Sequence, residues 1–275
     1  MSDLEYDRRR RLQLRLDEVV RDNRFTIAVV FPAVGGVTLL ASAWGLLPAP
    51  LAFNPYLLLF GVAVMRLPLI AGIAPLVTRR AAVGLALLCL YTWAIEWIGV
   101  RTGYPYGEFG YGVDLGPMLL GEVPAALPLF FVPIVANAYL LCLLLLGSRA
   151  RSAALRVPVA VVAVVGMDLV LDPAAVSIGF WAYEAGGAYY GVPWTNYAGW
   201  VLSATVAVVL LDLSFERAGL LDRLAECGFM LDDLVSFVIL WGIVNAAFGN
   251  WLPLGLALVY GYGLWRTDRF DFPTR

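Results

Sequence analysis

Long, nearly uncharged apolar runs fill most of this chain and leave it few ways to fold. Eight are recognised, each close to the length that a helix needs to cross a hydrocarbon layer about 30 Å thick, at residues 25–47, 54–77, 82–100, 124–146, 157–178, 198–215, 231–248 and 250–266. In lipid every backbone N–H and C=O must be paired within the protein, which favours helices. The sequence therefore predicts an all-α, polytopic transmembrane helix bundle.

The amino-acid composition excludes several kinds of catalytic and binding site. The chain is 61% hydrophobic and 15% charged, against about 45–50% and about 25% in soluble domains. It has no His, which excludes His-based catalysis and His-ligated metal sites. The three cysteines have no metal or disulfide spacing, and a net charge of −2 offers no basic surface for nucleic acid. All 19 basic residues are Arg, as in a salt-loving source, although GC-rich coding has the same effect.

Arginines predict the orientation. Every second connection between the apolar runs is rich in Arg and the others are nearly free of it, Arg101 being the exception. By the positive-inside rule, eight spans with both termini cytoplasmic fit this alternation. A seven-span count, which merges the last two short runs at Gly249, is the alternative, and it would place the last Arg cluster outside. The expected location is the cell membrane, as a multi-pass protein.

The chain is expected to form one domain with short ends. Residues 1–24 are charged throughout and do not resemble a cleavable signal peptide. We interpret them as a polar N-terminal tail, and a short interfacial helix is the alternative. A single transmembrane domain follows at 25–266, with a short C-terminal tail at 267–275.

Ionisable side chains inside spans cost about 2.5–3.5 kcal/mol each, so each calls for a reason. Asp168 and Asp172 lie four residues apart, on one helical face. Two carboxyls this close in a low dielectric cannot both ionise easily, so one is expected to keep a proton beside a carboxylate, as acid–base chemistry requires. The alternative is a structural pair that holds Arg66 or Asn side chains. Pro173 follows at once and is expected to kink or break the span.

Glu96 is the third candidate. It shares a helical face with Trp93, and burial against an indole would favour the neutral acid. Its alternative role is partner to Arg66 or Arg101. Arg66 lies in the middle of a span and is expected to form a structural ion pair with one of the carboxylates. In the predicted orientation the three carboxyls meet two long loops, at residues 101–123 and 179–197, which are expected to lie on the same outer side. We therefore expect one cavity, roofed by Tyr104, Tyr106, Trp181 and Trp194.

The chain resembles the carotenoid-biosynthesis membrane-protein family that contains bisanhydrobacterioruberin hydratase. Motifs from the third to the sixth span carry the resemblance: Glu96-x-x-Gly99, Gly103-Tyr104-Pro105-Tyr106-Gly107 with Tyr111, Leu115-Gly116-Pro117, Val123-Pro124, Asp168-x-x-x-Asp172-Pro173, Gly179-x-Trp181, Tyr190-Gly191-Val192-Pro193, Asn196-Tyr197 and Gly199-Trp200. One departure is Ala182-Tyr183, where a second Trp near Trp181 would be expected.

The resemblance implies hydration of the isoprenoid ends of a long acyclic carotenoid, of the kind that converts bisanhydrobacterioruberin to bacterioruberin. We expect Glu96 or Asp168 to be the protonated acid, and Asp172 the carboxylate that positions water, with no cofactor and no metal. Aromatic faces would stabilise the cation. The expected substrate-binding residues are Trp93, Trp97, Tyr104, Tyr106, Tyr111, Trp181, Tyr190, Trp194, Asn196 and Trp200.

The expected partners are a carotenoid within the bilayer and water, with other carotenoid-biosynthesis membrane enzymes as candidates and nucleic acid excluded. Two alternatives stay open. A carotenoid end-group cyclase would use the same acid and aromatic wall but exclude water. A non-enzymatic carotenoid- or lipid-binding membrane protein would not need convergent carboxyls on a closed apolar tunnel.

Overall fold

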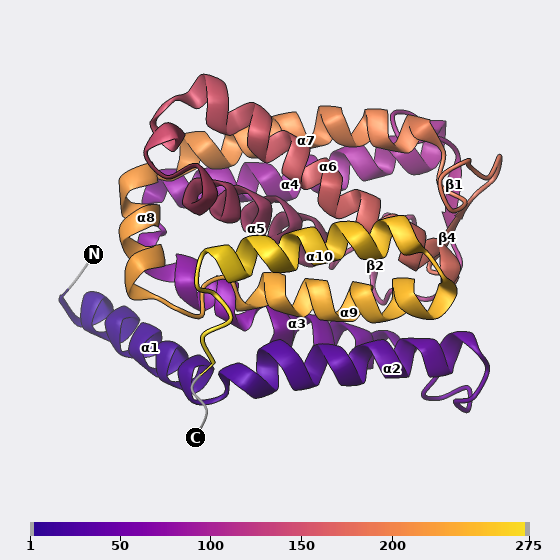
Figure 1. The fold of residues 1–275 in the computed structure, drawn as a ribbon, viewed down its shortest axis with the longest axis horizontal. Coiled ribbons are helices and arrows are strands. Elements are labelled where there is room, and N and C mark those ends of the chain that lie inside the picture. The colour runs from indigo at the N-terminus through magenta and orange to yellow at the C-terminus, as the bar shows by residue number, and fades with distance from the viewer. Residues whose placement is uncertain (1–2, 273–275) are drawn as a thin grey trace.

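The computed structural model describes residues 3–272, and this part of the chain is a helix bundle (Figure 1). Its helices are α1 (Asp3–Asp22), η1 (Thr26–Val30), α2 (Phe31–Ala43), α3 (Pro55–Ile73), η2 (Ala74–Leu76), α4 (Arg79–Thr102), α5 (Pro128–Leu146), η3 (Gly147–Arg151), α6 (Ala153–Ser177), α7 (Trp194–Ser214), α8 (Arg217–Glu226), α9 (Asp232–Phe248) and α10 (Trp251–Arg266). The predicted all-α class is confirmed.

Four short strands lie in the two long loops. They are β1 (Phe109–Tyr111), β2 (Met118–Leu119), β3 (Val123–Pro124) and β4 (Trp181–Tyr183). β2 and β3 form a small hairpin within the first loop, whereas β1 and β4 pair antiparallel and join the two loops. The prediction that both loops lie on one side of the bundle agrees with this pairing.

Six helical segments within the described residues are long and apolar enough to cross a membrane: Thr26–Ala43, Pro55–Leu76, Arg79–Thr102, Pro128–Arg151, Ala153–Ser177 and Trp194–Ser214. The last two predicted runs form α9 and α10, which have 17 and 16 residues and are shorter than these six. A membrane-spanning role for α9 and α10 is therefore still a proposal.

The helices run between two ends of the bundle that differ in character (Figure 1). One end carries α1, α8 and the segment that follows α10, whereas β1 and β4 lie at the opposite end. Both described ends of the chain are thus far from the two loops. This is the arrangement that an even number of crossings produces.

Residues 3–22 form helix α1 rather than an irregular tail. The helix is tied to the bundle: the Gln13 amide donates to Ala74 O at 3.3 Å, and Asp17 pairs with Arg223 at 3.0 Å. Val20 is fully buried. A helix here is what the alternative interpretation of this segment predicted.

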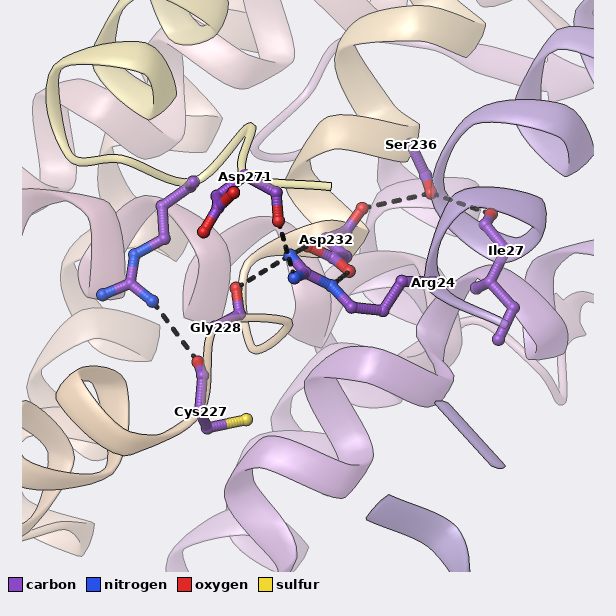
Figure 2. A network of polar contacts seen from close by, with 8 residues as sticks. Arg24, Ile27, Cys227, Gly228, Asp232, Ser236 and Asp271 are labelled. Carbon is purple, nitrogen blue, oxygen red and sulfur yellow. Dashed lines mark hydrogen bonds and ion pairs between the residues drawn. The ribbon is translucent and has the colours of Figure 1, made fainter. Parts of the chain in front are cut away.

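A polar network ties the chain ends to the loop between α8 and α9 (Figure 2). The Arg24 guanidinium donates to both carboxylate oxygens of Asp232, at 2.8 and 2.9 Å. It also donates to Gly228 O at 3.2 Å and to Asp271 O at 2.9 Å. One partly buried cation therefore joins three segments that lie far apart in the sequence.

Arg66 forms the predicted ion pair, but with a different carboxylate. It lies in α3 and donates to Asp233 of α9 and, at 3.1 Å, to Leu129 O at the start of α5. Asn137 of α5 donates to the second Asp233 oxygen at 2.7 Å. Asp233 is fully buried, so it supplies the counter-ion in place of Glu96, Asp168 or Asp172.

Candidate active site

One cavity lies beneath the paired loops, between α4, α5, α6, α7 and α9. It encloses about 940 Å³ of space, its open mouth included. Most of the wall is apolar or aromatic. The lining residues are Thr92, Ile95, Glu96, Tyr106, Phe109, Tyr111, Leu115, Pro124, Leu127, Phe130, Phe131, Ile134, Leu171, Asp172, Phe180, Trp181, Tyr183, Asn196, Trp200 and Trp241.

The β1–β4 ribbon forms the roof of this cavity. Tyr111 lies opposite Trp181, and Phe109 opposite Tyr183. All four line the cavity, because alternate residues of a strand point to the same side. The residues between them, Gly110 and Ala182, are exposed. Strand register therefore directs four aromatic side chains inward.

Tyr106 forms a second part of the roof and depends on two glycines. A β-carbon at Gly199 of α7 would meet Tyr106 Cδ1 at 2.6 Å and the Pro105 carbonyl oxygen at 2.8 Å. A β-carbon at Gly99 of α4 would meet Tyr106 Cδ2 at 3.1 Å. The Tyr106 hydroxyl lies 2.7 Å from the Ser203 hydroxyl. Three of the sequence motifs thus form one close contact between α4, the first loop and α7.

Glu96 lines the cavity near the end of α4 that leads into the first loop. This helix begins at the N-cap Thr78, whose hydroxyl accepts from Ala81 N at 3.2 Å, and ends at Gly103 with a left-handed φ of 71°. The Tyr111 hydroxyl donates to Glu96 Oε1. Arg66 and Arg101 do not pair with Glu96, since Arg66 binds Asp233 and Arg101 binds the Glu122 carboxylate at 2.7 Å. The predicted structural alternative for Glu96 is therefore wrong.

The two aspartates of α6 meet one amide of α7. Asn196 Nδ2 donates to Asp172 Oδ2 at 2.5 Å and to Asp168 Oδ2 at 3.1 Å. Asp172 Oδ2 also accepts from the Tyr183 hydroxyl at 2.8 Å. Both carboxyl groups thus accept from the same amide nitrogen. Asp172 lines the cavity, whereas Asp168 is fully buried behind it and its Oδ1 has no partner among the described residues.

Helix α6 is not broken at Pro173, so of the two predicted effects, a kink or a break, the break does not occur. It continues to Ser177, because side chains from other segments satisfy the backbone around the proline. Pro173 has no N–H for the carbonyl four residues earlier, that of Leu169. This oxygen lies 3.4 Å from the Tyr189 hydroxyl, which donates to it, and Asn245 donates to Val170 O at 2.9 Å. Asp172 is therefore held on a continuous helix.

Aromatic rings surround the space between the carboxyl groups. Trp200 stacks on Phe131 with centroids 5.2 Å apart and planes at 17°. Trp241 and Trp181 both pack near Phe180. Three of these five rings are indoles, the side chains whose faces attract a cation most strongly.

The phenols of the roof are neutral hydrogen-bond donors. Burial, together with the nearby Glu96 carboxyl, raises the pKa of Tyr111 far above the ordinary value of tyrosine. Burial and the aspartate pair do the same to the pKa of Tyr183. Both hydroxyls therefore keep their protons at any working pH.

Several predicted binding residues lie outside the cavity lining. Tyr104 and Trp194 are 63% and 62% exposed and do not form part of the roof. Trp93 donates to Ala125 O at 3.2 Å, and the Arg101 guanidinium lies 4.6 Å from the Trp97 ring. The Tyr190 hydroxyl accepts from Leu252 N at 3.3 Å. Of the predicted set, the lining includes Glu96, Tyr106, Tyr111, Asp172, Trp181, Asn196 and Trp200.

Other lining residues carried no signal in the sequence. Phe130, Phe131 and Trp241 lie inside apolar runs, where a cavity-facing ring looks the same as a lipid-facing one. Tyr183 appeared only as a departure from the family pattern, although it binds Asp172 directly. Among residues 3–272, no group of three or more Cys, Asp or Glu side chains is arranged to hold a metal ion. Cofactor-free chemistry is still a prediction.

Comparisons with known proteins agree on one family. A family model described as "Carotenoid biosynthesis protein" matches residues 53–264. A curated relative, bisanhydrobacterioruberin hydratase from Haloarcula japonica, is 65% identical over 258 residues, which cover 94% of this chain and 88% of the relative. No solved structure matches.

Proposed function

Since this chain belongs to the carotenoid biosynthesis protein family, we propose that it is a membrane-embedded hydratase that adds water across the terminal isoprenoid C=C of a long acyclic carotenoid. The observation that carries the proposal is the presence of Glu96 and Asp172 on the wall of one aromatic cavity. The Haloarcula relative is named a bisanhydrobacterioruberin hydratase, so bisanhydrobacterioruberin is the proposed type of substrate.

Glu96 is the proposed general acid. The sequence left this role open between Glu96 and Asp168, and only Glu96 lines the cavity. The Tyr111 hydroxyl holds Oε1, which leaves Oε2 to carry a proton toward the alkene. A carboxylic acid surrounded by apolar side chains favours its neutral form, which is the form that can protonate a C=C.

Asp172 is the proposed base. Its Oδ2 accepts two hydrogen bonds, from Tyr183 and Asn196, and donors of this kind stabilise a carboxylate. Asp168 lies behind it, away from the cavity, so we assign Asp168 a positioning role. A proton kept on Asp168 lets the pair carry one negative charge, which resides on Asp172.

The reaction balances with water alone. The Glu96 proton adds to the less substituted alkene carbon, and the π electrons form the new C–H bond, leaving a tertiary cation. Trp181, Trp200 and Trp241 line the space where this cation would lie, and an indole face stabilises a desolvated cation by about 2 kcal/mol or more. Water attacks the cation, Asp172 takes the water's proton, and that proton returns to Glu96 through solvent. The product is a tertiary alcohol.

The apolar cavity and the helical spans fit a substrate that arrives from the bilayer. A rod-like polyene would keep most of its length in lipid and present one end group to the cavity. The proposed setting is the cell membrane, with α9 and α10 completing eight spans and both termini cytoplasmic. The paired loops would then lie at the outer surface, where water is available.

Product analysis tests this function. The chain is expressed in a host that accumulates the anhydro-carotenoid, and extracted pigments are examined by mass spectrometry. A gain of one water per processed end is expected. An isomer of unchanged mass would instead identify an end-group cyclase. Unaltered carotenoid that co-purifies with the protein would identify a binding protein, and either outcome would overturn the proposal.

A further inference from the structure

Two tyrosines on neighbouring strands each bind one of the two cavity carboxyls. Tyr111 of β1 donates to Glu96 Oε1, and Tyr183 of β4 donates to Asp172 Oδ2 at 2.8 Å. Glu96 and Asp172 come from different helices, α4 and α6. The ribbon therefore connects the acid and the base of the proposed reaction.

The register of the ribbon fixes where these two hydroxyls lie. Tyr183 lies opposite Phe109, and Tyr111 is two residues further along β1. The Phe109 ring lies between the tyrosines, with its centroid 5.9 Å from that of Tyr111 and 6.0 Å from that of Tyr183. A slip of one residue in either strand would turn the phenol of that strand out of the cavity.

The loops leave the ribbon little freedom to slip. Gly112 N donates to Phe180 O at 2.9 Å just beyond one end of the pairing, and Glu184 N donates to Glu108 O at 3.0 Å beyond the other. A β-carbon at Gly112 would meet the Gly179 carbonyl oxygen at 2.3 Å. The two loops thus approach as closely as their backbones allow.

From this geometry we propose that Tyr111 and Tyr183 are positioning residues, which hold Glu96 and Asp172 by one oxygen each so that strand pairing sets the orientation of acid and base. This role rests on the proposed function, and it makes the β1–β4 ribbon the element that orients the acid and the base. Burial and the nearby carboxyls raise the pKa of both phenols, which suits them to donate hydrogen bonds to Glu96 and Asp172 rather than protons to a substrate.

Tyr111→Phe and Tyr183→Phe test the proposal, because each removes one hydroxyl and keeps the ring in the cavity wall. Initial hydration rates are measured in vesicles over a range of carotenoid concentrations. Each variant is expected to lower kcat by about 10- to 100-fold, the size of one hydrogen bond to a charged group, while KM changes little. Tyr183 binds the Asp172 carboxylate, and the bond from Tyr111 gains this strength as Glu96 gives up its proton. The matched control is Tyr56→Phe, at an exposed tyrosine of α3 away from the cavity, with wild-type kcat and KM expected.

A spectroscopic measurement checks Tyr111 independently of turnover. The infrared carbonyl band of protonated Glu96, identified by its loss in Glu96→Gln, is expected to move to higher frequency in Tyr111→Phe, since the hydrogen bond to Oε1 is gone. Two results would overturn the positioning role: wild-type kcat in both phenylalanine variants, or a Glu96 band that does not move. An inactive wild-type chain would count against the proposed function itself, and the infrared shift would still decide whether Tyr111 holds Glu96.

Discussion

The ring of Tyr106 occupies the space that a β-carbon on residue 199 would need. A β-carbon built on Gly199 would lie 2.6 Å from Tyr106 Cδ1, closer than such atoms pack in proteins. A shift of the ring alone would not make room, because the Pro105 carbonyl oxygen of the backbone would still lie 2.8 Å from the same β-carbon. A glycine in α7 therefore allows the first loop to reach the cavity.

Gly199→Ala should accordingly displace Tyr106 and open the cavity roof. Overpacking of this kind typically costs about 1–3 kcal/mol of unfolding free energy, and hydration should fall with it. Thermal unfolding in detergent and product yield measure the two effects. Gly255→Ala in α10 is the control, since its β-carbon would meet nothing within 4 Å and should leave both unchanged or raise stability slightly. If Gly199→Ala and Gly255→Ala have the same unfolding temperature and the same product yield, the close contact of Gly199 with Tyr106 does not matter for stability or function.

Arg66 is expected to matter for stability through Asp233. In Arg66→Leu a fully buried carboxylate loses its cation, and breaking such a pair typically costs about 3–5 kcal/mol of unfolding free energy. The double variant Arg66→Leu/Asp233→Leu should recover most of the loss. Arg101→Gln is the control, because its pair with Glu122 is 53% and 29% exposed and exposed pairs contribute little to stability. If Arg101→Gln lowers the thermal unfolding temperature as much as Arg66→Leu does, the stabilising role of the Arg66–Asp233 pair is refuted.

The loop pairing can be tested by a disulfide. Gly110 and Ala182 are exposed and directly opposite each other on β1 and β4, and paired residues of antiparallel strands have Cα atoms about 4.5–5.5 Å apart. This spacing suits a disulfide. Oxidised Gly110→Cys/Ala182→Cys should form an intramolecular bond, seen by mass spectrometry after proteolysis. A Gly110→Cys/Leu120→Cys pair, both in the first loop but unpaired in the structure, should not.

Much of the fold could be predicted because burial in lipid leaves a strong local signal. Apolar runs predicted the helices, and the Arg alternation agrees with chain ends that lie opposite the loops. Pairing of β1 with β4 could not be predicted, since strands of three residues carry no usable periodicity. For residues 3–22 a helix was only the alternative prediction, because so many charged residues are typical of a solvated tail. Contacts with distant residues, such as Asp17 with Arg223, fix this helix to the bundle and cannot be predicted from the local sequence.

The candidate site was partly predictable for a related reason. Glu96 and Asp172 stood out because a carboxyl is rare inside a span. Their partners Tyr111 and Tyr183 did not, because a tyrosine near a membrane surface has an ordinary explanation in the interfacial belt. The same belt explains Tyr104 and Trp194, which lie outside the cavity. Asp233 could not be predicted as the Arg66 partner, because it lies in the first turn of α9, where an acidic residue is commonplace.

The hydration rate of Asp172→Asn tests the proposed chemistry most directly. The amide keeps the size and the hydrogen-bonding shape of the carboxyl but cannot accept the water's proton, and a general base typically contributes about 10²–10⁴-fold in rate. The variant should fold and retain bound carotenoid while hydroxylated product falls by that factor, and Glu96→Gln should behave alike through loss of the acid. If both variants keep most of the wild-type hydration rate, the two carboxyls are structural and the proposed mechanism is wrong.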